Sequence, residues 1–170
     1  MLSIGGIFAY NVNGMTLFTK KYSENVPTDL FSKFKSNLGG ELIIVDKKLV
    51  AYKQINDLVI CVIAYDSEQN EIQIYEVLTN LIEALNLSLG KHQLDQVAVS
   101  DYFDFIAIAI NEMIFEGIVL ETDPQTIASR VSKRPSQAVS ELSEIRTGGQ
   151  SVSQAFSRVK EGFFEKYLLK

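Results

Sequence analysis

The segment LVICVIA, residues 58–64, constrains the fold more than any other part of this chain, because every one of its residues is apolar. A strand with one face in water alternates between apolar and polar residues, whereas a continuous apolar run of this length is typical of a strand covered on both faces. We therefore expect residues 58–64 to form the central strand of a sheet, with helices packed on both sides of it.

Two predicted hairpins supply four further strands. Residues 4–12 and 15–22 flank Asn13-Gly14, which is the strongest short-range hairpin signal because both central residues of a type I′ turn have positive φ. Two more apolar segments, ELIIVD and LVAYK, flank the polar residues 46–48 and form the second hairpin. With the central segment these make a five-stranded antiparallel sheet.

The period of two along a strand predicts which side chains of the first hairpin share a face. In the expected register, Leu17 lies on the same face as Phe8 and Tyr10, while Ile7 and Phe18 lie on the other. One of these faces belongs to the core, and the other is partly covered.

Three helices are predicted between residues 28 and 116. The first spans residues 28–38 and ends at Gly39-Gly40, and the second has apolar residues at helical spacing over 74–89 and ends at Gly90. Residues 94–116 contain the strand-like alternation FDFIAIAI, but their length favours one buried helix of about six turns. The expected fold class is therefore α+β, with helices on both faces of the sheet.

The stretch EGIVLETDP, residues 116–124, holds three carboxylates, which makes it a candidate acid-base or metal site. A structural interpretation is favoured over either. Gly117 is a natural stop for the preceding helix, while Asp123 and Pro124 are suited to the N-cap and first position of the next one. Glu116 and Glu121 are expected to be solvated, because no partner base, nucleophile or regular set of metal ligands lies nearby in the sequence.

Composition excludes several classes of function. The net charge of −5 and the pI of about 4.9 argue against nucleic acid as a partner, since binding to phosphate depends on Lys and Arg. No stretch reaches the roughly 20 apolar residues that span a bilayer, and the first residues lack the basic start of a secretory signal. With Cys61 as its one cysteine, the chain is expected to be soluble and cytosolic.

No residue pattern predicts catalysis, a cofactor, a metal or a small-molecule substrate. His92 is the one histidine and is expected in a solvated loop, while Cys61 lies in the central strand, so the two are not expected to form a nucleophile and its base. The glycine pairs at 39–40 and 148–149 lack the flanking strand and lysine of a phosphate-binding loop.

The chain changes character after residue 131. Residues 1–131 form the predicted domain, and residues 132–151 are rich in Ser, Gln, Gly and charge, which is typical of a mobile linker. Residues 152–170 form a predicted amphipathic helix, a C-terminal extension that buries its apolar stripe either against its own domain or against a partner. The candidate partner-binding residues on that stripe are Phe156, Val159, Phe163 and Tyr167.

Four segments carry a resemblance to a known family: GMTLFTKKY, LVAYKQINDLVICVIAY, NEIQIYEVLTNLIEAL and INEMIFEGIVLETDPQTIASRV. They resemble the small chains of the clathrin-adaptor family, which have a longin-like fold, and the likeness extends over about residues 7–131. Within the family the zeta-type chains of coatomer are more similar than the sigma chains of clathrin adaptors. Sigma chains usually carry a tryptophan in the second strand and an arginine-rich YRRYASL-like segment, and this chain has neither.

The resemblance implies a non-catalytic coat subunit that binds neither GTP nor a metal. It implies a heterodimer with the trunk of the large coatomer gamma subunit, within a heptameric coat that an Arf-family GTPase recruits to Golgi membranes for retrograde transport. The alternative is a sigma-type chain whose apolar pocket binds leucine-based sorting signals of cargo.

Overall fold

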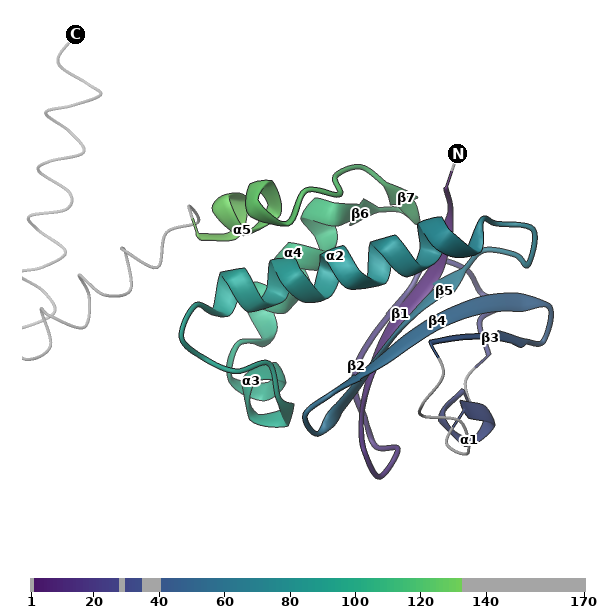
Figure 1. The fold of residues 1–170 in the computed structure, drawn as a ribbon, viewed down its shortest axis with the longest axis horizontal. Coiled ribbons are helices and arrows are strands. Elements are labelled where there is room, and N and C mark those ends of the chain that lie inside the picture. Colours follow the sequence, from purple (N-terminus) through teal and green to yellow (C-terminus); the bar gives the residue numbers. More distant parts are fainter. Residues whose placement is uncertain (1, 28–29, 35–40, 133–170) are drawn as a thin grey trace, which may run out of the picture. The chain divides into compact units, whose positions relative to one another are not determined.

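A computed structural model describes residues 2–27, 30–34 and 41–132, which belong to one unit, Met1–Lys133 (Figure 1). The predicted linker, apart from Ser132, and the predicted C-terminal helix therefore lie outside the described residues. So does most of the predicted helix at 28–38, of which the structure describes Leu30 and the four residues of α1, Phe31–Phe34.

The five predicted strands are confirmed and form one antiparallel sheet in the order β2-β1-β5-β4-β3. The apolar segment at 58–64 is the middle strand, β5, and all seven of its residues are buried. Complete burial follows from this position, because neighbouring strands cover both edges and side chains cover both faces. The strands are β1 (Ile4–Asn11), β2 (Thr16–Lys21), β3 (Leu42–Val45), β4 (Lys48–Ile55) and β5 (Leu58–Ala64).

The first hairpin forms where it was predicted, but its turn is not of type I′. Only Gly14 of the Asn13-Gly14 pair has positive φ, 89°. The side chain of Asn11 organises the loop instead, because its Oδ1 accepts the N–H groups of Asn13 and Met15 at 3.0 and 2.9 Å. Asn11 is only 6% exposed, and its side-chain oxygen supplies the acceptor for the N–H groups of Asn13 and Met15.

The predicted face of Leu17 is wrong because β2 contains a bulge. Ala9 pairs with Phe18 but Tyr10 pairs with Thr16, which leaves Leu17 as an extra residue between the two pairs. Leu17 therefore packs against the core on the same side as Ile7 and Phe18, rather than with the aromatic residues on the opposite face.

A helical layer covers one face of the sheet, and α1 lies on the other (Figure 1). The predicted helix at 74–89 is confirmed as α2. It begins after Asn70, whose side chain accepts hydrogen bonds from the N–H groups of Ile72 and Gln73, and it ends before Gly90, where φ is 63°. The helices of this layer are α2 (Glu71–Leu89), α3 (Gln96–Asp101), α4 (Phe103–Met113) and α5 (Pro124–Ser132).

The single helix predicted over 94–116 is wrong at two points. The helix breaks at Tyr102, whose φ of −114° and ψ of 29° lie outside the helical region, and so divides into α3 and α4. Directly after the break, the Phe103 ring packs against Phe18 of β2, with 5.5 Å between centroids. The second helix then stops at Met113, and a short hairpin follows, formed by β6 (Ile114–Phe115) and β7 (Ile118–Val119).

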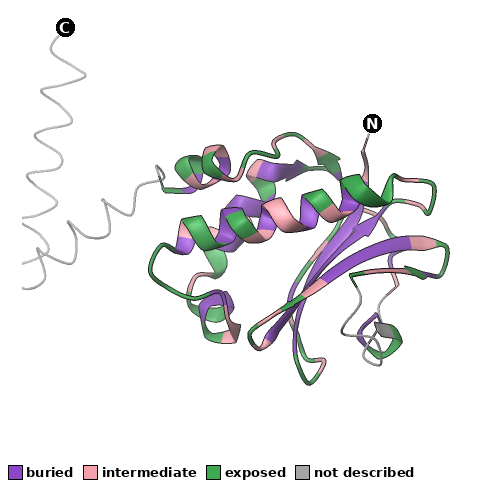
Figure 2. Ribbon diagram, viewed as in Figure 1, coloured by how far each residue is buried: buried purple, intermediate pink, exposed green. Residues whose placement is uncertain are grey.

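The sheet separates two cores, and Figure 2 shows its inner strands, β1, β5 and β4, as mostly buried. The larger core lies under α2, α4 and α5 and consists mainly of aliphatic residues. The smaller core is aromatic, because Tyr10 lies between Phe8 and Phe31 at centroid distances of 6.0 and 5.6 Å. In the part of the chain that the structure describes, no helix combines the length and the apolar character needed to span a bilayer.

Candidate partner-binding surface

The two residues considered for nucleophilic chemistry do not meet. Cys61 is buried in β5 and belongs to the aromatic core, and burial raises the pKa of its thiol far above the ordinary value. His92 follows α2 in an exposed loop, as predicted, but it has a partner there: its Nε2 lies 2.9 Å from the Tyr102 hydroxyl. Over residues 2–27, 30–34 and 41–132, no group of three or more potential ligands is arranged to hold a metal ion.

The stretch at 116–124 is a corner built on a two-residue hairpin turn. Glu116 and Gly117 have φ of 49° and 81°, so the turn between β6 and β7 is of type I′. The prediction that Gly117 ends the preceding helix is wrong, because that helix already ends at Met113. Gly117 is required for a different reason: a Cβ atom at this position would lie 2.7 Å from the backbone oxygen of Ile4.

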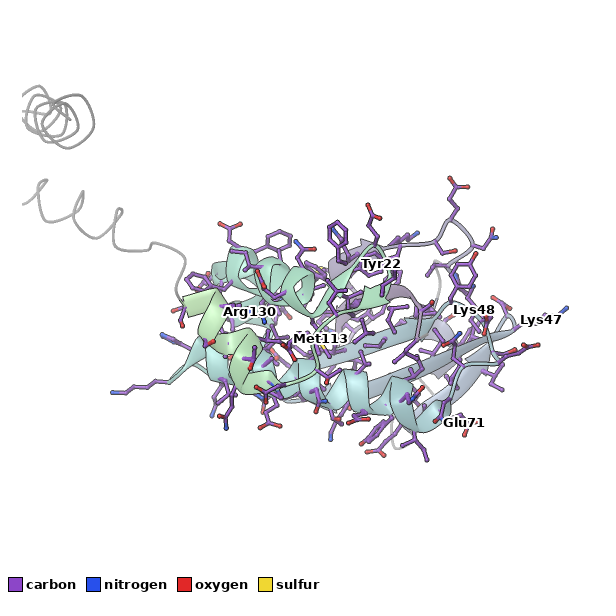
Figure 3. The ribbon with its side chains drawn as sticks, turned by 90° about the horizontal axis from the view of Figure 1, so that it is seen from above. Tyr22, Lys47, Lys48, Glu71, Met113 and Arg130 are labelled. Atoms are coloured by element: carbon purple, nitrogen blue, oxygen red, sulfur yellow. The ribbon has the colours of Figure 1, made fainter. Side chains whose placement is uncertain are left out.

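Contacts with other elements hold this hairpin in place. The Ile4 N–H donates to the Gly117 oxygen at 2.7 Å, which ties the turn to the start of β1. The Tyr22 hydroxyl donates to the Ile114 oxygen at 3.3 Å, and burial raises the pKa of Tyr22 to about 12. Together with the hydrogen bond from the Leu120 N–H to the Met113 oxygen at 2.9 Å, these contacts fix both strands of the hairpin. Figure 3 labels Tyr22 and Met113.

Two of the three carboxylates of the corner, those of Asp123 and Glu121, have structural partners, while Glu116 is exposed, as predicted. Asp123 caps α5 as predicted, since its Oδ2 accepts the Thr126 N–H at 2.8 Å, and hydrogen bonds from Thr126 lower the pKa of this carboxyl. Glu121 is not simply solvated: its carboxylate lies 3.3 Å from Nη2 of Arg130, whose Nη1 lies 3.7 Å from Glu112. Arg130 and Met113 are labelled in Figure 3. The ion pairs of Arg130 with Glu112 and Glu121 link α4, the segment that follows β7, and α5, and these acidic residues therefore stabilise the corner.

The apolar residues of the corner divide between the core and the surface. Ile114 is fully buried and pairs with Val119, while Phe115 pairs with Ile118 on the outward face. Phe115, Ile118 and Leu120 are 58%, 38% and 64% exposed. We call these three residues the hairpin surface. Sequence reasoning missed it, although two apolar pairs on either side of Glu116-Gly117 are the signal of a short hairpin.

The residues predicted to bind a partner, Phe156, Val159, Phe163 and Tyr167, lie outside the described residues, so their role stays a prediction. An apolar cavity does exist between the sheet and the helical layer, lined by residues such as Phe18, Leu81 and Ile106. Its volume of about 20 Å³ is room for roughly one water-sized sphere, too little for a leucine side chain.

Five antiparallel strands with a helical layer on one face and a short helix on the other make the longin-like α+β architecture expected from the sequence. Residues 7–138 match the family model of the clathrin adaptor complex small chain. The chain belongs to this family.

The chain is similar in sequence to coatomer zeta subunits. The probable coatomer subunit zeta-A of Dictyostelium discoideum is 32% identical, over 91% of this chain and 83% of its own. Coatomer subunit zeta-2 of Arabidopsis thaliana is 27% identical over 93% and 91%, and coatomer subunit zeta-1 of Homo sapiens is 28% identical over 95% and 90%.

Among solved structures, a chain from a homology model of the full-length AP-3 complex in a stretched open conformation is similar, with a TM-score of 0.53. The match covers 83% of this chain and 98% of that chain, at 16% identity, and it shows a common fold. Family membership makes this chain a small subunit of a multi-subunit vesicle coat, and not an enzyme.

Proposed function

We propose that this chain is the zeta-type small subunit of coatomer and that it pairs with the trunk of the large gamma subunit. The observation that carries the proposal is the likeness to zeta subunits over nearly the whole chain in organisms as distant as Dictyostelium discoideum and Homo sapiens. The alignments run through nearly the whole chain at 28–32% identity, and on this basis we expect the partner surface to be of the same kind.

In this role the chain is cytoplasmic and reaches the Golgi membrane indirectly, as part of a heptameric coat recruited by an Arf-family GTPase. Its work is to stabilise the large subunit during retrograde and intra-Golgi transport. The acidic composition supports indirect membrane association, since a net charge of −5 opposes direct attraction to anionic lipids.

The predicted C-terminal helix is proposed as a second contact with the large subunit, through Phe156, Val159, Phe163 and Tyr167. Truncation after Gln150 tests this contact. If the four residues bind the partner, the truncated chain keeps its melting temperature and loses affinity for the gamma trunk. A large fall in the melting temperature of the free chain would instead mean that these residues belong to its own core.

The pairing is tested by co-expressing the chain with the gamma trunk and, in parallel, with the trunk of an adaptor large subunit. We expect a stable one-to-one complex with the gamma trunk alone, and a rise in the melting temperature of the small chain on binding. Titration of the free chain with leucine-based sorting peptides examines the sigma-type alternative. Saturable micromolar peptide binding, or preference for the adaptor trunk, would refute the zeta-type assignment.

A further inference from the structure

We propose that the hairpin surface, Phe115, Ile118 and Leu120, is a docking site for a partner protein whose contact surface is apolar at its centre and basic at its rim. This inference rests on the proposed function, because the partner it describes is the large subunit of the same coat. It adds the place on this chain where that subunit binds and the chemistry of the surface that binds there.

The first argument is that folding does not require these side chains to be apolar. The inward pair of the hairpin, Ile114 and Val119, already joins the core, and neither Phe115 nor Ile118 belongs to it. Three large apolar residues within six positions, each more than a third exposed, are a concentrated apolar surface. Soluble proteins that expose such residues together usually use them for binding.

The second argument is that the surface is held rigidly. An isolated two-stranded hairpin is marginal in water, but here Ile4 and Tyr22 hydrogen-bond the turn and β6, and Leu120 itself donates to Met113. A surface ordered by folding loses little conformational entropy on binding, which favours affinity. An aromatic residue held in this way, as Phe115 is, is the kind of side chain that dominates interface energetics.

The third argument concerns the charge of the surroundings and decides the chemistry of the occupant. The segment from Glu112 to Ser132, which contains the hairpin and the elements next to it in the chain, holds four acidic residues, Glu112, Glu116, Glu121 and Asp123, and one basic residue, Arg130. This local excess of negative charge attracts a basic protein surface and repels an anionic membrane.

The test compares the double variant Phe115→Ser/Ile118→Ser with Val97→Ser in the full chain. Val97 is a matched control because it is 63% exposed on α3, at the other end of α4 from the hairpin (Figure 1). Affinity for the purified gamma trunk is measured by calorimetry at low and high salt. We expect the double variant to bind at least tenfold more weakly, Val97→Ser to bind within twofold of the unaltered chain, and the affinity of the unaltered chain to fall as salt rises.

Each other outcome has a distinct meaning. If the unaltered chain binds the trunk and the double variant binds within twofold of it, the hairpin surface is not the docking site. Binding that does not respond to salt would refute the proposal that the partner's surface has a basic rim. Capture of the unaltered chain by phosphatidylserine vesicles, if it is lost in the double variant, would make the hairpin surface a membrane contact instead. Failure of the unaltered chain to bind the trunk at all overturns the proposed function and this inference together.

Discussion

Replacing Gly117 by alanine measures how strongly the fold depends on the close approach between the hairpin turn and β1. The added Cβ atom would lie 2.7 Å from the oxygen of Ile4 and 3.2 Å from Cβ of Tyr22. The first of these neighbours is backbone in the sheet, so it cannot rotate away. The turn must therefore shift, and the 2.7 Å hydrogen bond from the Ile4 N–H to the Gly117 oxygen is lost or lengthened.

The expected cost has two parts. A residue other than glycine at a φ of 81° loses roughly 1–2 kcal/mol in backbone conformation. Loss of the hydrogen bond adds about 0.5–1.5 kcal/mol, so Gly117→Ala should lower the free energy of unfolding by about 2–3 kcal/mol. In urea, with a slope near ~2 kcal/mol per molar, the unfolding midpoint should fall by about 1–1.5 M.

Gly90→Ala is the matched control, because Gly90 also has positive φ, 63°, but no atom lies within 4 Å of the position of its added Cβ. It therefore carries only the conformational part, roughly 1–2 kcal/mol as at Gly117. Both variants are unfolded in urea and followed by far-ultraviolet circular dichroism. If Gly117→Ala loses no more stability than Gly90→Ala, the close approach to β1 contributes nothing and the reasoning is refuted.

Four shorter predictions follow from other described contacts. Asn11→Ala should lower stability by about 1–3 kcal/mol, measured by chemical denaturation, because two backbone N–H groups lose their acceptor. Glu121→Gln should change it by less than about 1 kcal/mol, since its ion pair with Arg130 is partly exposed to water; a larger loss would contradict this. Cys61 should react with a thiol reagent at the rate of unfolding, because it is buried and burial raises its pKa. The Asp123 carboxyl has a lowered pKa, so its cap on α5 should stabilise the chain fully above the ordinary pKa of aspartate. This stabilisation should be lost as the pH falls through the lowered pKa, and Asp123→Ala should remove that part of the pH dependence of stability.

The parts of the fold that sequence reasoning predicted are those specified by local pattern. The unbroken apolar run at 58–64 can only be accommodated between two strands and two layers, and β5 is found there. The periodic residues of α2 lie between the cap at Asn70 and the positive φ of Gly90, so both ends of that helix are encoded within the helix itself or next to it.

The errors have tertiary causes. The bulge that moves Leu17 depends on how β2 pairs with β1, and nothing in the alternation of TLFTKK marks an extra residue. The break at Tyr102 coincides with the packing of Phe103 on Phe18, a contact between elements far apart in the sequence. A type I′ turn does occur in the sheet, but at Asp46-Lys47, with φ of 50° and 61°, where the two-residue connection imposes a positive φ on a lysine, which rarely adopts it.

The corner at 116–124 shows how the chemistry of a residue can mislead about which residues face a partner. Its carboxylates attract attention as candidate ligands or acids, yet those of Glu121 and Asp123 are engaged within the corner. The apolar residues between them look like ordinary core, but pairing across β6 and β7 directs Ile114 and Val119 inward and leaves Phe115 and Ile118 outside. Because a strand places successive side chains on opposite faces, the turn at Glu116-Gly117 decides which apolar residues stabilise the chain and which remain for binding.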